Sequence, residues 1–355
     1  MNLLLFNLAT DADDPILGFT TQWINHLAAH FERVDVITMR AGRLEVAPNA
    51  RVFSVGKERG YGEARRALEF YKLLGGLLAR ERYAACFAHM MPLFAVMGAP
   101  LLIPARVPIT LWYTHRQDHR TLRLAEAVSR RVVTAAHDSF PFSSPKLRVL
   151  GHGIDTDLFH PPRAGESTLP DQPRYVVHVA RLMPIKHQTT LIRALPEVPG
   201  AVAVLVGDER PEAPDYRQQL ETLAADLGVG DRLTFTGSLP PEGVRTWYHR
   251  AAAAVNLSPV GLFDKAALEA MACAAPTIVS NPAFDPLLGA DIGRLRIDSP
   301  DDHAGLAQRL NALFALDPVE RAALGAAISA RTVESHSLEG LIARLVRVLI
   351  TGESM

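Results

Sequence analysis

The sequence predicts an α/β protein made of two doubly wound domains. Three observations support this prediction. Short apolar runs alternate with amphipathic stretches along the whole chain, a pattern typical of parallel sheets covered by helices. The chain has 355 residues, which is too long for a single ordinary hydrophobic core. A polar, proline-rich segment without periodicity, residues 161–173, interrupts the alternation and is typical of a linker.

The first predicted domain covers residues 1–160. Short apolar runs predict its strands at Leu3–Asn7, Val34–Thr38, Val52–Val55, Ala85–His89, Ile109–Tyr113, Val132–Ala135 and Leu147–Leu150. Helical spacing predicts helices at Phe19–His30, Gly62–Arg80 and Thr121–Ser129. The longest apolar stretch, between His89 and Arg106, is divided by prolines and is too short to span a bilayer, so we expect a buried helix followed by a strand.

The second predicted domain covers residues 174–335, followed by a terminal helix in residues 336–355. Its expected strands are Tyr175–Val179, Val202–Val206, Leu233–Thr236, Ala253–Leu257, Thr277–Ser280 and Arg294–Ile297. Its expected helices are Gln188–Leu195, Asp215–Leu227, Glu242–Arg250 and Lys265–Cys273, and the tail has apolar residues at helical spacing. In doubly wound sheets ligands bind beyond the C-terminal strand ends, so we expect the site in a cleft between the domains.

Composition excludes several classes of protein. The net charge of −1 gives no reason to expect a nucleic acid partner. Cys86 and Cys273 lie in apolar contexts without metal-ligand or redox spacing, which favours buried free thiols in a reducing compartment. The first residues, MNLLLFNLATDADDP, have no basic leader and soon turn acidic, unlike a signal peptide. We therefore expect a cytoplasmic protein, with contact to the inner-membrane surface left open.

Two cations follow the first strand of the second domain. In HVARLMPIK, Arg181 lies just beyond the apolar run and Lys186 follows five residues later, with Pro184 between them. A guanidinium fork and an ammonium at this spacing can bind two adjacent phosphates and stabilise a departing diphosphate. The alternative is a pair of solvated surface cations in a loop.

A carboxylate near a helix start follows some eighty residues later. In VGLFDKAALEAMACAAP, Gly261 breaks the chain, a helix is expected from Asp264, and Glu269 lies among apolar neighbours. The first N–H groups and the dipole of such a helix attract phosphate, and a carboxylate there can accept from a ribose diol. The alternative makes Asp264 an ordinary N-cap and Glu269 a solvated helix residue, but a carboxylate in so apolar a context needs a partner.

Glycines and one histidine mark further candidate positions. Gly207 and Gly237 follow strands directly, and Gly18 lies between the first strand and the first helix. Glycine permits close approach of the backbone to a base, ribose or phosphate, although turn chemistry is the commoner reason. His115 follows a strand and is a candidate contact to a sugar hydroxyl. His115 and His119 have the i, i+4 spacing of a metal-binding pair only if their segment is helical. No third ligand is apparent, so we expect no metal site.

The chain contains no serine elbow, zinc-ligand spacing or Walker-type loop. The predicted chemistry is therefore transfer assisted by stabilisation of a leaving group. It requires neither a cofactor nor a bound metal.

These motifs, taken in order, resemble the retaining glycosyltransferases of family four, which have the two-Rossmann GT-B architecture. The matching segments are LGHGIDTDLF, VARLMPIKH, VGDERP, DRLTFTG and NLSPVGLFDKAALEAMACAAPTIVSN. They run from about Val149 to Ser280, and the match is weaker over the first half. The resemblance implies two Rossmann-like domains facing a central cleft, with the last helix packed back on the first domain.

The resemblance also implies roles for individual residues. The family's phosphate clamp corresponds to Arg181 and Lys186, and its ribose-binding glutamate corresponds to Glu269. A turn of backbone N–H groups at the diphosphate corresponds to Phe263 and its successors, and the family's histidine corresponds to His115. The catalytic set is then Arg181, Lys186 and His115, and the donor-binding set is Gly18, Gly207, Gly237, Gly261, Phe263, Asp264, Lys265, Ala266 and Glu269.

One departure concerns the sugar end of the pocket. The family usually has a second glutamate eight residues before the ribose glutamate, and this chain has Gly261 there, with Asp264 where the family has glycine. One hypothesis is that Asp264 or Lys265 takes the place of the missing glutamate; both alanine variants are then expected to lose transfer without losing thermal stability. A larger pocket is the alternative.

The resemblance implies a retaining, hexosyltransferase-type enzyme that uses a nucleotide-diphosphate sugar as donor and a saccharide or lipid-linked acceptor, in polysaccharide or glycan assembly. A non-catalytic nucleotide-sugar-binding subunit is one alternative, favoured by Gly261. A sugar-nucleotide epimerase on the same architecture is another. The sugar, the base, the acceptor and the oligomeric state are left open.

Overall fold

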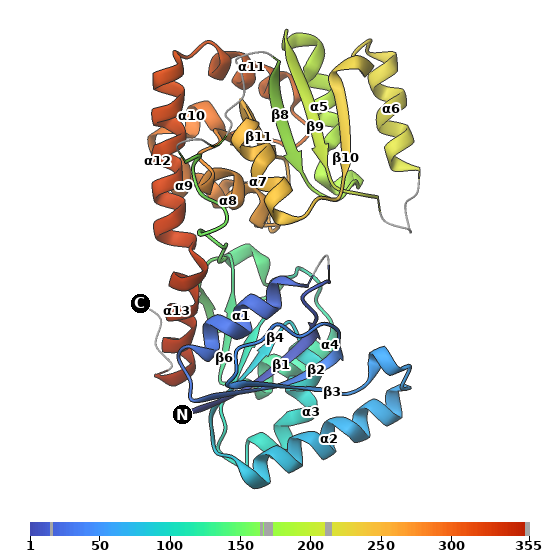
Figure 1. Cartoon of the computed structure of the whole chain (residues 1–355), viewed down its shortest axis with the longest axis vertical. Helices are drawn as coiled ribbons and strands as arrows, with labels where there is room; N and C mark the ends of the chain where they lie inside the picture. The colour runs from blue at the N-terminus through green and yellow to red at the C-terminus, as the bar shows by residue number, and fades with distance from the viewer. Residues whose placement is uncertain (15–16, 164–165, 167–172, 210–214, 352–355) are drawn as a thin grey trace. The chain divides into compact units, whose positions relative to one another are not determined.

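The computed structural model describes residues 1–14, 17–163, 166, 173–209 and 215–351, and these form two compact units. The first unit comprises Met1–Gly151 and the residues from Leu338 onward, and the second comprises His152–Ser337. Each unit is a parallel-sheet α/β domain of Rossmann-like type, as the sequence predicts (Figure 1).

The first unit contains a seven-stranded sheet in the order β3-β2-β1-β4-β5-β6-β7, and all of its pairs are parallel. This is the order of a doubly wound sheet, in which successive strands are added first to one side of β1 and then, from β4 onward, to its other side. The strands are β1 (Asn2–Thr10), β2 (Arg33–Ala41), β3 (Ala50–Ser54), β4 (Tyr83–His89), β5 (Ile109–Trp112), β6 (Arg131–Thr134) and β7 (Leu147–Val149).

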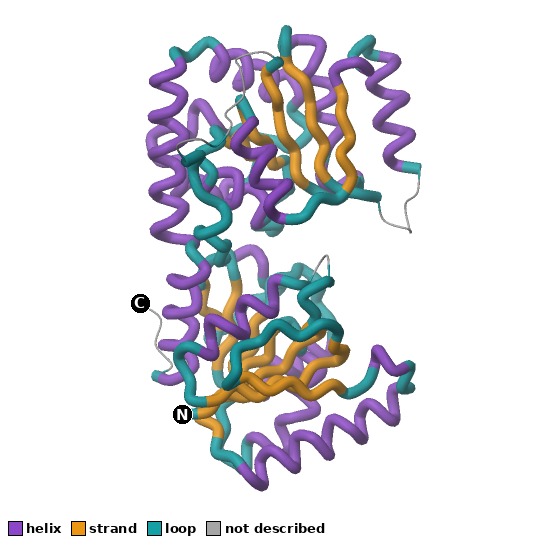
Figure 2. The backbone as a smooth tube through the Cα atoms, in the orientation of Figure 1, coloured by secondary structure: helices purple, strands orange, loops and turns teal. Residues whose placement is uncertain are grey.

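Helices cover both faces of this sheet (Figure 2). Alternation along β4 shows the division: Cys86 and Ala88 belong to a core cluster with side chains of α2, α3 and α4, whereas Phe87 stacks on Trp23 of α1 at 6.4 Å. The last helix, α13, packs against α1 and β4 on that second face. The helices are α1 (Phe19–Ala28), α2 (Glu63–Arg80), α3 (Pro92–Leu102), α4 (Arg120–Val128) and α13 (Leu338–Ile350).

The second unit contains a five-stranded parallel sheet in the order β10-β9-β8-β11-β12. Its strands are β8 (Arg174–Val179), β9 (Ala201–Val206), β10 (Leu233–Gly237), β11 (Ala253–Asn256) and β12 (Thr277–Val279). The strand order again reverses beside the first strand, between β8 and β11, which is where ligands bind in such sheets.

The helices of the second unit pack in two groups. Helix α5 lies against α6 and α11, and α8 lies against α7 and α12. The helices are α5 (Gln188–Ala194), α6 (Tyr216–Asp226), α7 (Pro241–Arg250), α8 (Lys265–Ala272), α9 (Asp285–Leu288), α10 (Ile292–Leu295), α11 (His303–Phe314) and α12 (Pro318–His336). Single 3₁₀ turns, in both units, lie at Lys57–Arg59, His137–Ser139, Pro184–Lys186, Leu195–Glu197, Gly230–Arg232, Pro282–Phe284 and Gly289–Asp291.

The structure differs from the sequence prediction at three places. The expected strand Arg294–Ile297 is wrong, because α10 occupies Ile292–Leu295 and only Arg296 bridges to Val279. Helices α11 and α12 were not predicted. The units divide after Gly151 and not after residue 160, since Ile154 pairs with Ser337 at the end of α12. Most of the expected linker 161–173 lies outside the described residues.

Two further expectations concern single features of the chain. Cys86 and Cys273 are both buried free thiols. Among the described residues, no helix combines the length and the apolar character that crossing a bilayer requires.

Candidate functional site

The segment that carries the two predicted cations leaves β8 and is fastened to its neighbours. The Gln188 side chain donates to the Arg181 carbonyl at 2.9 Å, and the Leu182 N–H donates to the Asp208 carbonyl at 3.0 Å. Arg181 is exposed, whereas Lys186 ends a 3₁₀ turn and is only 9% exposed. The structure therefore presents one cation to solvent and holds the other inside the fold.

Lys186 is fixed by a network that joins three segments of the second unit. Its ammonium donates to Ser258 Oγ at 3.0 Å and to Asp264 Oδ2 at 2.5 Å. Ser258 Oγ also donates to Asp264, and Asn256 Nδ2 lies 3.3 Å from the same carboxylate oxygen. Charge pairing offsets the cost of burying both ions. The ammonium is thus positioned before any ligand arrives.

Helix α8 begins beside this network. Asp264 occupies the N-cap position with extended backbone, but its side chain makes no capping hydrogen bond to the helix. The carboxylate is turned toward Lys186 instead. The first turn of α8, with its positive dipole end, accordingly lies next to a fixed ammonium, an arrangement that attracts an anion.

Glu269 lies one turn along α8 from Lys265, so their charges interact as an i, i+4 pair. Burial raises the pKa of Glu269, against the lowering influence of the Lys265 charge. Burial lowers the pKa of Lys265, against the raising influence of Glu269. Neither residue is a solvated surface group, which agrees with the requirement that a carboxylate in this apolar context has a partner.

Phe263 and Ala266 anchor the start of α8 to the rest of the second unit. The Phe263 ring is buried and stacks on Phe284 at 4.5 Å and on His152 at 6.0 Å. The buried Tyr248 hydroxyl donates to the Ala266 carbonyl at 2.9 Å. The Phe263 side chain is therefore a core residue, and a donor-binding role for either residue would fall to its backbone N–H.

Gly261 occupies a turn that requires glycine. The Leu262 N–H donates to the Pro259 carbonyl at 3.1 Å, which closes a β-turn with Gly261 in its third position at a φ of 90°. A positive φ at this position is typical of a type II turn and strains any side chain with a Cβ. The backbone thus explains why glycine stands where the family usually has glutamate.

This geometry changes the hypothesis about Asp264. Its carboxylate accepts from Lys186, Ser258 and Asn256, so removing it breaks a partly buried network as well as any contact to the donor. We therefore expect Asp264→Ala to lose thermal stability, contrary to the sequence-based hypothesis. That Lys265, at the start of α8, takes the place of the missing glutamate stays a prediction.

Gly207 and Gly237 face each other at the ends of β9 and β10, where the Gly207 N–H donates to the Gly237 carbonyl at 2.9 Å. A Cβ on Gly207 would lie 2.2 Å from the Ala180 carbonyl oxygen, and Gly237 has a φ of 71°. Close approach of protein backbone therefore accounts for Gly207, and turn chemistry accounts for Gly237.

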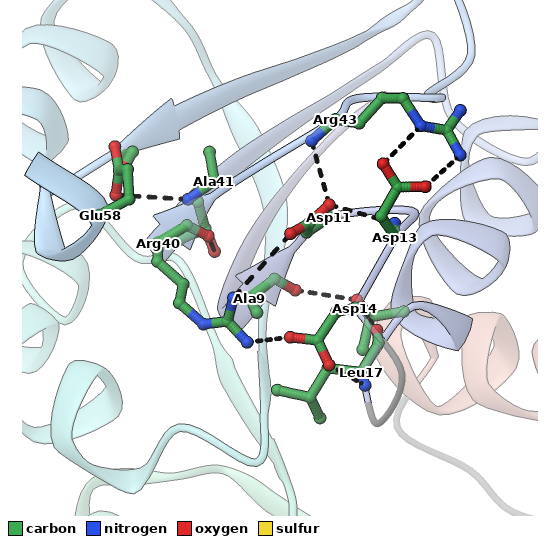
Figure 3. Close-up of polar contacts among 12 residues, drawn as sticks. Ala9, Asp11, Asp13, Asp14, Leu17, Arg40, Ala41, Arg43 and Glu58 are labelled. Carbon is green, nitrogen blue, oxygen red and sulfur yellow. Dashed lines mark hydrogen bonds and ion pairs between the residues drawn. The ribbon is translucent and has the colours of Figure 1, made fainter. Parts of the chain in front are cut away.

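Gly18 lies in the first unit, at the N-cap of α1. A Cβ there would lie 2.7 Å from the Asp14 carbonyl oxygen. Figure 3 shows the preceding loop held by charged side chains: Arg40 is paired with Asp14, and Arg43 forks onto Asp13 at 2.6 and 2.8 Å. The carboxyl ends of β1 and β2 thus carry an ordered group of polar side chains.

His115 is exposed in the loop after β5, also in the first unit, and its ring lies 6.5 Å from that of Tyr113. His119 has a structural role, because its Nδ1 accepts from the Leu122 N–H and caps α4. A hollow of about 340 Å³ in the same unit is lined by residues between His137 and Val149 and includes none of the predicted site residues.

One cluster that the sequence analysis did not single out lies in the second unit. His160, Glu166 and His249 bring one potential metal-ligand atom each within 4.8 Å of one another. The two histidines are 89 positions apart, so local spacing carries no signal for the cluster.

Comparison with known proteins finds a family match within the second unit. Residues 163–326 match the family Glycosyl transferases group 1. The chain is 25% identical over 301 residues to a D-inositol 3-phosphate glycosyltransferase of Mycobacteroides abscessus, an alignment covering 81% of this chain and 67% of the relative. For a similar relative from Acidothermus cellulolyticus the alignment covers only 63% of the relative.

A shorter match has higher identity. A GDP-mannose-dependent alpha-(1-6)-phosphatidylinositol monomannoside mannosyltransferase of Mycolicibacterium smegmatis is 34% identical over 205 residues, covering 52% of this chain and 51% of the relative.

Two solved structures show the same fold along the whole chain. Sucrose-phosphate synthase from Thermosynechococcus elongatus superposes with a TM-score of 0.78 at 21% identity, covering 99% of this chain and 100% of the other. HepE of Anabaena, in complex with UDP, superposes with a TM-score of 0.77 at 18% identity, again with 99% and 100% covered. These likenesses extend the two-domain Rossmann-like architecture to the first unit.

Proposed function

We propose that this protein transfers a sugar from a nucleotide-diphosphate sugar to a hydroxyl acceptor, with retention of anomeric configuration. The observation that carries the proposal is the preorganised Lys186 ammonium beside the first turn of α8, with Glu269 on the same helix. The family match of residues 163–326 and the UDP complex of HepE support a nucleotide donor at this unit.

The donor diphosphate would lie between the Lys186 ammonium and the first N–H groups of α8. Arg181, exposed after β8, would add a second cation, and Glu269 would accept hydrogen bonds from the ribose diol. Burial raises the pKa of Glu269 to about 7, against the lowering influence of the Lys265 charge, and a carboxyl in either protonation state can accept from a ribose hydroxyl.

In the transfer step the bond between the anomeric carbon and the phosphate oxygen breaks, and its electron pair leaves with the diphosphate. The acceptor oxygen forms the new bond on the same face, and its proton passes to the departing diphosphate. Lys186 and Arg181 stabilise the charge that grows on the leaving group; fixed cations of this kind need no reorganisation during the reaction.

We place the acceptor on the first unit, at the carboxyl ends of β1 and β5, with Gly18 and His115 as contacts. The printed names of the relatives suggest the acceptor's chemistry: one acts on an inositol phosphate and another on a phosphatidylinositol mannoside. A polyol or saccharide, free or lipid-linked, is therefore the acceptor class to test first, in glycan assembly.

Transfer assays with two conservative variants test the proposal. Arg181→Gln and Lys186→Met are expected to lower turnover by ~10²–10³-fold each, the usual effect of removing one preorganised donor at a developing charge. Arg181 is exposed, so its variant also separates chemistry from stability. NMR of the product's anomeric proton reports retention or inversion.

His30→Gln, an exposed position in the first unit, is the matched control. Wild-type turnover in both cation variants would refute the leaving-group role. A wild-type protein that binds nucleotide sugars but transfers none to a panel of polyols and saccharides would favour the non-catalytic subunit.

A further inference from the structure

The cluster of His160, Glu166 and His249 has the chemistry of a transition-metal site. His160 is 8% exposed, the His249 side chain is 6% exposed, and the Glu166 side chain is 31% exposed. His249 Nδ1 lies 3.8 Å from Glu166 Oε2. Two buried imidazoles therefore face a carboxylate that solvent still reaches.

The hydrogen bonds of the two imidazoles fix their tautomers. His160 Nδ1 lies 2.7 Å from the Pro161 carbonyl oxygen, and His249 Nε2 lies 2.7 Å from the His160 carbonyl oxygen. A carbonyl oxygen only accepts, so each of these nitrogens carries the proton. The other nitrogens, Nε2 of His160 and Nδ1 of His249, then hold lone pairs. A backbone carbonyl behind the ligand nitrogen is the usual outer contact of a metal-binding histidine.

The third group is prepared in the same way. Glu166 accepts from the Arg163 N–H at 2.7 Å, and this hydrogen bond, more than any other influence, lowers the pKa of its carboxyl. Burial lowers the pKa of His249, against the raising influence of its own hydrogen bond and of Glu166. Neutral imidazole and ionised carboxylate are the forms in which these side chains bind metal.

We propose that these three side chains bind Zn²⁺, with water in the fourth position. Two nitrogens and one carboxylate suit zinc, whereas Mg²⁺ and Ca²⁺ require mostly oxygen ligands. Tetrahedral zinc, with bonds of ~2.0–2.2 Å, places its ligand atoms roughly 3.2–3.6 Å apart. The ligand atoms of the cluster lie within 4.8 Å of one another, and His249 Nδ1 lies 3.8 Å from Glu166 Oε2, so small shifts of the side chains would bring them to these distances.

The site has a structural role in the second unit. His249 is near the C-terminal end of α7, whereas His160 and Glu166 belong to the segment that precedes β8. A bound zinc would fasten His160 and Glu166 to α7 independently of any donor sugar. Its binding therefore stabilises the folded state by mass action and requires no role in transfer.

Zinc binding to the full-length protein tests the proposal. After treatment with EDTA and its removal, the protein is titrated with ZnCl₂ in the presence of excess MgCl₂, and bound zinc per chain and the melting temperature are measured. We expect one tightly bound zinc and a rise of roughly 5–10 °C when zinc exceeds its Kd a hundredfold. Glu166→Gln and His249→Gln are each expected to weaken binding by at least tenfold, and His30→Gln is expected to leave it unchanged.

The variants also separate a specific site from zinc held at the surface. Circular dichroism of each variant without zinc verifies its fold, and if His249→Gln does not fold, Glu166→Gln alone decides. Equal zinc binding by the wild type and Glu166→Gln, or no zinc retained by the wild type, would overturn the proposal.

Discussion

Replacing Asp264 by alanine removes the counter-ion of a nearly buried ammonium, and the cost can be worked from the structure. The Lys186 side chain is 11% exposed and the Asp264 side chain is 23% exposed. Removing one partner of a fully buried ion pair costs ~3–5 kcal/mol, and partial solvent access reduces the expected loss here to ~2–3 kcal/mol. For a domain of this size that loss lowers the melting temperature by roughly 5–10 °C.

Replacing both partners has a different consequence. In Lys186→Met/Asp264→Ala neither charge is left buried, so the double variant is expected to be more stable than Asp264→Ala alone. The coupling energy between the two positions should be about 1–3 kcal/mol. Nucleotide binding should still be lost, because the ammonium is absent. The double variant thus recovers stability without recovering nucleotide binding.

Calorimetry of the wild type, the two single variants and the double variant measures the cycle, and a parallel titration with UDP measures binding. Asp301→Ala is the matched control, since Asp301 pairs with the neighbouring His187 but its side chain is 77% exposed. The network does not hold Lys186 in the way its contacts indicate if Asp264→Ala has the same melting temperature as the wild type. The same conclusion follows if the effects of the two substitutions on stability are additive.

Three other predictions follow from backbone geometry and burial. Gly261→Glu restores the usual family residue at a φ of 90°, so we expect a loss of ~1–2 kcal/mol in thermal unfolding, with Gly261→Asn less affected. Gly207→Ala places a Cβ 2.2 Å from the Ala180 oxygen and should cost ~1–3 kcal/mol, whereas Gly60→Ala, with no atom within 4 Å of its Cβ, isolates the cost of positive φ alone. Burial, and next the Lys186 charge, lower the pKa of His178 to about 3, and neither of its ring nitrogens has a hydrogen-bond partner among the described residues. Between its ordinary pKa and that value only the unfolded state binds the proton, so stability falls with decreasing pH by up to ~1.4 kcal/mol per pH unit; His178→Val should flatten this slope in urea unfolding at pH 4–7.

Elements with clear periodicity could be predicted from the sequence. The apolar runs predict β8 and β9 as strands, and the amphipathic pattern predicts α7 as a helix. Parallel pairing then follows from the alternation of strands and helices. The strand prediction for Arg294–Ile297 was wrong because apolar and charged residues alternate there as in a strand, whereas α10 extends to Leu295. Helices α11 and α12 carried a usable signal, since Asp302 and Asp317 cap them by accepting from Gly305 and Val319.

The candidate site was predictable only in part, for a physical reason. Arg181, Lys186 and Glu269 carry local signals, because each lies next to a strand end or a helix start. The partner of Lys186 is 78 positions away, and the two histidines of the proposed zinc site are 89 positions apart. Contacts at such separation depend on the folded arrangement of several elements. The turn at Gly261 is the exception, because Pro-Val-Gly-Leu is itself a local turn signal.

The most direct test of nucleotide binding in the second unit combines a ligand change with a residue change. Calorimetric titration compares UDP, GDP and ADP with the 2′,3′-dideoxy form of whichever binds best, on the wild type and on Glu269→Gln. We expect the wild type to lose at least tenfold in affinity when the ribose hydroxyls are removed, and Glu269→Gln to bind both forms equally weakly. The same loss in both proteins, or no binding of any nucleoside diphosphate, would contradict a ribose and diphosphate site formed by Glu269, Lys186 and α8.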